Sequence, residues 1–187
     1  MSEEAFTSVE AKVKLSDFKM DETYFYELDE TQDWVAKILA ELEENLEDDD
    51  EGREKGFLRT QFRVVRKKSH PWGDHLLVDG AIQSSYQAAC VRCLTITPRD
   101  LDIEIAGGFI NDHFEKQPEY EESTTFYTSN SEYDMYFHNK GTVNLGELIH
   151  EQVFMNVDTL PLHDPDCKGL CPICGVDRNK VDCGHDA

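Results

Sequence analysis

A dense group of metal-ligand side chains near the C-terminus constrains the fold of this chain more than any other feature. Six cysteines and histidines fall within 23 positions: His163, Cys167, Cys171, Cys174, Cys183 and His185. Two thiolates two residues apart, as in CPICG, can hold one ion, and Gly175 permits the tight turn between them. Thiolate and imidazole ligands favour Zn²⁺, with an iron–sulfur cluster as the weaker option. The spacing therefore predicts a tail folded around zinc.

A second C-x-x-C pair, Cys90 and Cys93, raises the number of ligands to eight, arranged as four close pairs. Two tetrahedral sites would use them all. One is a self-contained tail site of Cys171, Cys174, Cys183 and His185. The other pins the tail to the sheet through Cys90, Cys93, His163 and Cys167. We therefore prefer two zinc ions.

The alternative is one zinc ion in a site of four cysteines, with both histidines as bystanders. Its ligands would be Cys167, Cys171, Cys174 and Cys183. In either arrangement protein side chains fill every coordination position, whereas metal-ion catalysis needs an open one. Both arrangements predict a structural metal.

The composition indicates an acidic globular protein of the cytoplasm. The 187 residues carry a net charge of -21. The N-terminal segment MSEEAFTSVE has neither the basic nor the apolar region of a signal peptide, and no stretch approaches about 18 consecutive apolar residues. Cytosolic cysteines are more often metal ligands or redox groups than disulfides. A redox role for CVRC is disfavoured because nothing nearby resembles a thioredoxin unit.

Apolar residues that alternate with polar ones predict a sheet. Strands are expected over residues 10–18, 23–28, 57–68, 75–88 and 94–105, the last interrupted by Pro98, with one or two more over 124–138. In the segment 57–68, Leu58, Thr60, Phe62 and Val64 should point to one face and the charged residues to the other. The pair Gly107-Gly108 is too weak a signal for a phosphate-binding loop.

Helical spacing of apolar residues predicts two helices. The first starts with Asp29 and Gln32, carries an apolar face from Trp34 to Leu46, and runs into the acidic segment ELEENLEDDDE at 41–51. The second is capped by Asn144 with Glu147 and buries Leu145, Leu148, Ile149 and Val153.

The expected architecture is α+β: a mainly antiparallel curved sheet or partial barrel with two packed helices and a zinc-stabilised C-terminal tail. The α+β domain should span residues 1–160, with an acidic helix and loop insertion near 29–55. The cysteine and histidine tail should occupy residues 161–187 and dock on that domain.

One segment stands out as cationic in this acidic chain. No acid occurs between Gly56 and Gly73. The candidate RNA-binding residues there are Arg59, Arg63, Arg66, Lys67, Lys68 and Trp72. Phosphate contact combined with aromatic stacking is plausible for such a set. The alternative is a charged edge strand that discourages aggregation.

Several segments together resemble a known family. They are CVRCL after a strand, NLGELIHEQVFMNVDTLPL, DCKGLCPICGVDRN and a trailing C-x-H. From Gly73 to the end the chain resembles the bacterial and plastid YceD-like family of large ribosomal RNA subunit accumulation proteins. The resemblance implies a role in synthesis, processing or stability of 23S ribosomal RNA, and it implies that His163 and His185 replace cysteine ligands.

We therefore expect a non-enzymatic ribosome biogenesis factor whose partner is precursor 23S ribosomal RNA or a large-subunit assembly intermediate. No nucleophile motif or paired-carboxylate constellation occurs, and neither a membrane nor a small-molecule substrate is expected. An acidic chaperone for a basic ribosomal protein is the alternative, because the overall field suits a basic partner. An RNA-processing hydrolase is the distant third class.

Overall fold

The computed structural model describes residues 8–44, 46, 55–118, 120, 123–128 and 131–185. Its elements are β1 (Lys12–Lys14), the 3₁₀ helix η1 (Leu15–Asp17), β2 (Thr23–Leu28), α1 (Asp33–Leu42), β3 (Phe57–Ser69), β4 (Gly73–Ala89), β5 (Ile96–Asn111), β6 (Thr125–Thr128), β7 (Ser131–His138), β8 (Thr142–Asn144) and α2 (Leu145–Met155). None of the helices in these ranges has the length and apolar character needed to cross a membrane.

Six strands form one open sheet in the order β2-β3-β4-β5-β7-β6, and β1 pairs with β8 separately. Neighbouring strands are antiparallel, except that β5 runs parallel to β7. The predicted mainly antiparallel sheet with two helices is confirmed. The sheet is not closed into a barrel: within the described ranges, β2 and the four-residue β6 lie at opposite edges and do not pair.

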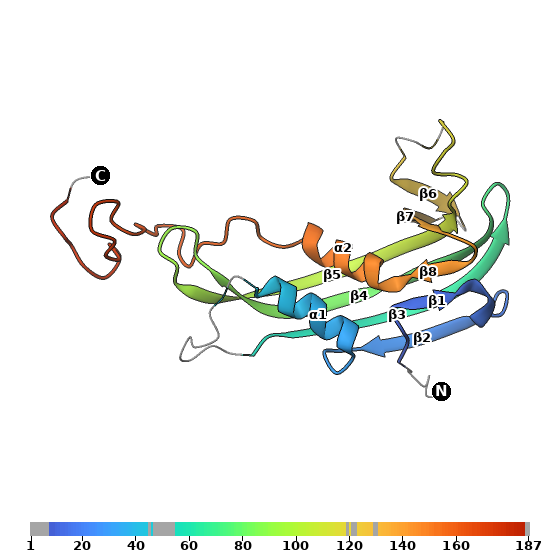
Figure 1. The fold of residues 1–187 in the computed structure, drawn as a ribbon, viewed down its shortest axis with the longest axis horizontal. Helices are drawn as coiled ribbons and strands as arrows, with labels where there is room; N and C mark the ends of the chain where they lie inside the picture. The colour runs from blue at the N-terminus through green and yellow to red at the C-terminus, as the bar shows by residue number, and fades with distance from the viewer. Residues whose placement is uncertain are drawn as a thin grey trace.

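Both helices cover the same face of this sheet (Figure 1). The alternation predicted for β3 is confirmed, since Leu58 and Val64 are fully buried beneath the helices while Arg59 and Arg63 are exposed on the other face. α2 begins as predicted, with the side-chain oxygen of Asn144 accepting a hydrogen bond from the backbone of Glu147. Its predicted stripe, Leu145, Leu148, Ile149 and Val153, is buried.

The first helix starts later and ends earlier than its apolar pattern predicted. Asp29 forms the turn before α1 instead of its first residue: its carboxylate accepts a hydrogen bond from the backbone of Thr31 at 2.9 Å. α1 ends at Leu42, so Leu46 lies beyond it. Most of the acidic segment, residues 45 and 47–51, lies outside the described residues.

Consecutive glycines in β5 permit close packing on both faces of the sheet. A Cβ atom on Gly107 would lie 2.6 Å from Leu148 Cδ1 of α2, and one on Gly108 would lie 2.3 Å from Phe126 Cζ of β6. Successive strand residues point to opposite faces, so one glycine admits the helix and the other admits the aromatic ring. The pair therefore has a packing role.

The hairpin of β4 and β5 positions the tail. The two strands pair from Leu76 and Phe109 to Ala89 and Ile96. Only residues 107–111 of β5 also pair with β7. Pro98 therefore lies where the second edge of β5 has no partner among the described strands, and the strand runs through it instead of being interrupted. The cysteine and histidine tail lies beyond the end of this hairpin (Figure 1).

Candidate metal centres

The turn between β4 and β5 forms a tight knuckle around the first C-x-x-C pair. The backbone N–H of Cys90 donates to Thr95 O, and the N–H of Leu94 donates to Cys90 O, both at 2.9 Å. Leu94 has a φ of 63°, in the left-handed region. This turn brings the Cys90 and Cys93 side chains to one side.

The CPICG segment repeats the same backbone structure. The N–H of Cys171 donates to Val176 O, and the N–H of Gly175 donates to Cys171 O, both at 2.8 Å. Gly175 takes the left-handed position with a φ of 74°. The two C-x-x-C segments are therefore equivalent knuckles, although only the second has the glycine that signals one in a sequence.

Leu94→Gly is expected to stabilise the protein by about 0.5 to 1 kcal/mol. A leucine in the left-handed region is strained by roughly 1 to 2 kcal/mol, which exceeds the entropic cost of a glycine. Little burial is lost, because Leu94 is 63% exposed. Urea unfolding of the metal-loaded protein measures the change. The reverse exchange in the second knuckle, Gly175→Leu, should destabilise, and an equal effect of both variants would contradict the equivalence.

The tail is attached to the first knuckle by backbone and arginine hydrogen bonds. Val91 N donates to Pro161 O, and Leu170 N donates to Arg92 O, both at 2.9 Å. The guanidinium of Arg92 donates to Cys167 O at 3.0 Å, and that of Arg99 donates to Leu162 O. These bonds bring His163 and Cys167 to Cys90 and Cys93. Sequence reasoning missed both arginines, because nothing local links them to residues about 60 to 75 positions away.

The first group consists of Cys90, Cys93, His163 and Cys167. One ligand atom from each lies within 4.8 Å of all the others. The sulfurs of Cys90 and Cys167 are 3.8 Å apart, and Cys93 Sγ is 3.2 Å from His163 Nδ1. Two sulfurs bound tetrahedrally at about 2.3 Å from zinc would lie about 3.8 Å apart. The first group could therefore hold a metal ion, and its donor set fits zinc.

The second group consists of Cys171, Cys174, Cys183 and His185. Its ligand atoms also lie within 4.8 Å of one another, with Cys171 Sγ 3.6 Å from His185 Nδ1. A sulfur and a nitrogen on one tetrahedral zinc would be about 3.6 Å apart. The eight side chains thus gather as the two sets of the preferred arrangement. Cys167 lies in the first set, whereas the one-ion alternative requires it beside Cys171, Cys174 and Cys183.

The two groups differ in exposure. The three cysteines of the first group are at most 6% exposed, whereas Cys174 and His185 of the second are exposed. Asn179 supports the first group: its side-chain Nδ2 donates to Cys167 Sγ at 3.4 Å, and its Oδ1 accepts from Lys168 N at 2.8 Å. Such bonds to a sulfur orient it and disperse its charge.

Each group contains one thiol that ionises readily and one that resists ionisation. Burial opposes ionisation of Cys90, but hydrogen bonds from His163 and neighbouring N–H groups outweigh it and lower its pKa to about 5. The backbone N–H groups of Cys174 and Ile173 lower the pKa of Cys171 to about 6. Burial raises the pKa of Cys167. A bound cation would supply the charge that a second thiolate requires.

The cations predicted for RNA contact do not form one surface. Arg59, Arg63 and Lys67 lie on the sheet face that the helices leave open, whereas Arg66 and Lys68 alternate to the helix side. Arg63 is 3.4 Å from Asp79, and Lys67 is 2.9 Å from Asp21. Asp100, Asp102 and Glu104 of β5 share the open face. Their charge partly offsets the cationic row.

Trp72 is placed where it cannot stack on a base. Its ring is 8% exposed and packs against Phe114, Tyr120 and Phe126 with centroid distances of 5.4, 5.4 and 4.9 Å. Its indole N–H donates to Tyr127 O at 3.2 Å. Buried indoles satisfy their N–H in this way, so Trp72 stabilises the fold at this end of the sheet.

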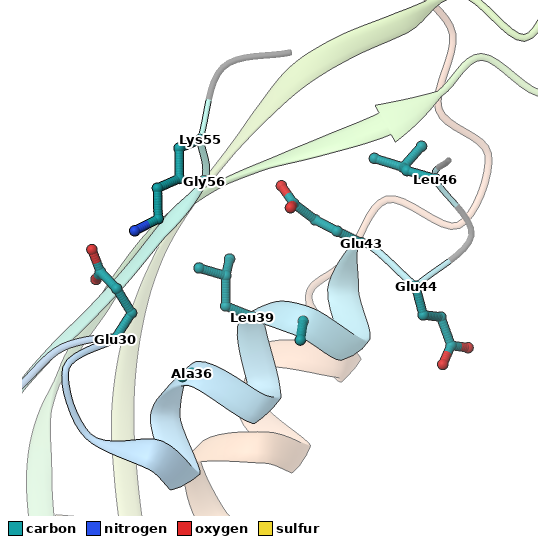
Figure 2. A pocket seen from close by; sticks show the side chains of 9 residues that line it. Glu30, Ala36, Leu39, Glu43, Glu44, Leu46, Lys55 and Gly56 are labelled. Atoms are coloured by element: carbon teal, nitrogen blue, oxygen red, sulfur yellow. The ribbon is translucent and has the colours of Figure 1, made fainter. Parts of the chain in front are cut away.

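A pocket of about 510 Å³ lies between the end of α1 and the start of β3 (Figure 2). Leu39 and Ala36 give it an apolar floor, the side chains of Glu30, Glu43 and Lys55 point into it, and Glu44 points away from it (Figure 2). Glu43 Oε1 accepts a hydrogen bond from Gln87 N at 2.9 Å. None of the candidate metal or RNA residues lines this pocket.

Comparison with known proteins places the metal groups in a family context. Residues 78–187, more than half of the chain, match the family model described as large ribosomal RNA subunit accumulation protein YceD. The matched range begins within β4 and includes all eight candidate ligands. Among curated proteins and among solved structures, none matches this chain. The chain therefore belongs to the YceD family of large ribosomal RNA subunit accumulation proteins.

Proposed function

We propose that this protein is a non-enzymatic, cytoplasmic ribosome biogenesis factor that supports the synthesis, processing or stability of 23S ribosomal RNA. The family match carries the proposal, because the matched range contains most of the β4–β5 hairpin, α2 and both ligand groups. Its partner is precursor 23S ribosomal RNA or a large-subunit assembly intermediate.

Two zinc ions complete the tail in this proposal. One is held by Cys90, Cys93, His163 and Cys167, and the other by Cys171, Cys174, Cys183 and His185. Soft and borderline donors support zinc over harder cations. Four protein ligands fill a tetrahedral ion, which suits a structural role. The first ion clamps the tail to the hairpin, and the second closes the tail itself.

Arg59, Arg63 and Lys67 contact RNA phosphates through the open face of the sheet. Exposed ion pairs such as Arg63 with Asp79 contribute only about 0 to 1 kcal/mol, so a phosphate can replace the carboxylate. Arg59 forms no ion pair within the described residues, and its guanidinium lies over the Phe57 ring, 5.4 Å from the centroid. The acids of β5 limit this surface to a narrow strip.

Depletion of the protein is expected to lower the amount of 23S ribosomal RNA relative to the small-subunit RNA. The triple variant Arg59→Glu, Arg63→Glu and Lys67→Glu should restore the ratio much less than the wild type, because it reverses the charge of the three cations that form the strip. Gel quantification of total RNA measures the ratio. A matched triple, Asp100→Lys, Asp102→Lys and Glu104→Lys, makes the charge of the same face more positive. This variant should restore the RNA ratio fully.

The two outcomes separate the parts of this proposal. An unchanged ratio on depletion would contradict the role in RNA accumulation. Full restoration by the charge-reversed triple would contradict the RNA strip alone. That result would favour the second candidate, an acidic chaperone for a basic ribosomal protein, which the net charge of -21 and the carboxylates in Figure 2 support.

A further inference from the structure

A second pocket, of about 630 Å³, opens at the opposite end of the sheet from the tail. Its lining residues come from β1, the turn from β3 to β4, the end of β5 and the turn from β7 to β8. Figure 1 shows these segments at the end of the sheet that is remote from the tail. The charged and titratable residues that line it are Lys14, Arg66, Asp74, His113, His138 and Lys140. Its volume lies within the range of sites that hold a small ligand or one residue of a polymer.

The lining is cationic in a protein whose net charge is -21. The one acid in it, Asp74, is occupied by Arg66, whose Nε and Nη2 donate to the carboxylate at 2.9 and 2.6 Å. Arg66 Nη1 also donates to Phe18 O at 3.1 Å, which fixes the guanidinium in place. Within the described residues neither Lys14 nor Lys140 forms an ion pair. The Lys14 ammonium donates one hydrogen bond to Thr142 Oγ1, which leaves two of its three N–H donors for an anion.

Lys140 lies in a tight turn where its backbone conformation is strained. Asn139 O accepts a hydrogen bond from Thr142 N at 2.9 Å, and the two residues between them, Lys140 and Gly141, have φ values of 49° and 76°. This is the geometry of a tight hairpin turn, which favours asparagine or glycine at both central positions. A lysine there is strained by about 1 to 2 kcal/mol. Turn formation therefore does not explain this cation.

A buried histidine ring forms part of the wall. His138 is 4% exposed, and its Nε2 lies 3.4 Å from Asp74 O. Its Nδ1 has no hydrogen-bond partner in the described part of the chain. Buried polar atoms are nearly always paired in folded proteins. His138 thus forms a rigid part of the wall, and its buried Nδ1 adds no contact to the two lysines.

We infer that this pocket binds a phosphate group through Lys14 and Lys140, with Arg66 held beside them. The inference rests on the proposed function in one respect: the phosphate belongs to the backbone of an RNA strand. Asp17 accepts a hydrogen bond from Lys14 N and Asp112 accepts one from the side chain of Asn139, and neither acid lines the pocket. Phosphate contacts of this kind are independent of base sequence.

The double variant Lys14→Gln and Lys140→Asn tests the inference on the full-length, zinc-loaded protein. Asparagine tolerates the left-handed turn, so the variant removes two charges without disturbing the backbone. Fluorescence anisotropy with a short fluorescein-labelled single-stranded RNA should show about tenfold weaker binding at low salt. Loss of two phosphate contacts should also reduce the slope of log affinity against log salt by about 1.4.

The control is Lys37→Gln with Lys168→Gln, which removes the same charge from exposed positions that do not line the pocket. Its affinity for the RNA should fall less than about twofold, since only the long-range field changes. Equal affinities of the two double variants would overturn the inference. So would the absence of binding to the wild-type protein.

Uridine monophosphate as a second probe distinguishes the source of the phosphate. Uridine monophosphate could bind the wild type but not the Lys14 and Lys140 variant, while this variant and the Lys37 and Lys168 control bind RNA equally well. In that case the pocket takes a small phosphate, and the inference that it holds an RNA strand is overturned. Each of these results is independent of the 23S RNA ratio after depletion. The pocket can thus fail while the proposed function stands, and the reverse also holds.

Discussion

Cys90→Ser is expected to reduce the zinc content from two ions to one and to destabilise the fold by at least about 3 kcal/mol. Cys90 is fully buried and 3.8 Å from Cys167 Sγ. A serine hydroxyl does not replace a thiolate on zinc, and loss of a structural zinc removes binding free energy of about 10 kcal/mol or more from the folded state. Native mass spectrometry gives the metal count, and thermal unfolding gives the stability.

Cys174→Ser is the matched control, since it removes an exposed cysteine from the second group. The Cys174→Ser protein should also bind one zinc ion. Its thermal unfolding temperature should fall less than that of Cys90→Ser, because the second group has no ligand from the β4 to β5 turn. A count of one ion in the wild type would restore the four-cysteine site. Two ions in Cys90→Ser would exclude Cys90 as a ligand.

Gly80→Ala is expected to destabilise the protein by at least about 3 kcal/mol. A Cβ atom at Gly80 would lie 2.2 Å from Gln61 O and 2.6 Å from Phe62 Cα, so it would meet the backbone of β3. Backbone atoms in a central strand pair cannot turn aside as a side chain can, and the sheet must separate or bend. Urea unfolding measures the loss.

Ala81→Val is the control for the glycine. It adds two methyl groups one residue further along β4, on the face that the helices leave open, where a β-branched side chain suits a strand. Its free energy of unfolding should change by less than about 0.5 kcal/mol. Similar values for the two variants would show that β3 can shift to admit a side chain at Gly80.

The candidate metal ligands could be predicted because each pair is local in sequence. Cysteine and histidine rarely cluster for packing reasons, so spacing alone picked out the eight residues. How the pairs combine depends on the β4 to β5 hairpin and on Arg92 and Arg99, whose acceptors are distant in sequence. The knuckle conformation of the first C-x-x-C turn was not predicted, because Leu94 rather than a glycine takes its left-handed position.

The cationic segment shows where one-dimensional reasoning fails. Strand alternation correctly separated Arg59 and Arg63 from the buried face. It could not show that Asp79, Asp21 and the acids of β5 share the surface, because strand neighbours come from the register of the sheet. Trp72 followed the cations in sequence, but its aromatic partners arrive after β5 and enclose it.

The first metal group has a topological consequence. Cys90 and Cys167 are 77 positions apart, and β5 through α2 all lie between them. With zinc bound, that stretch becomes a closed ring, and ring closure lowers the entropy of the unfolded chain by an amount equivalent to about 4.5 kcal/mol. A protease that unfolds the chain from its C-terminus would reach this ring before it reaches any strand. It would have to remove the zinc ion first, because only then is the chain linear.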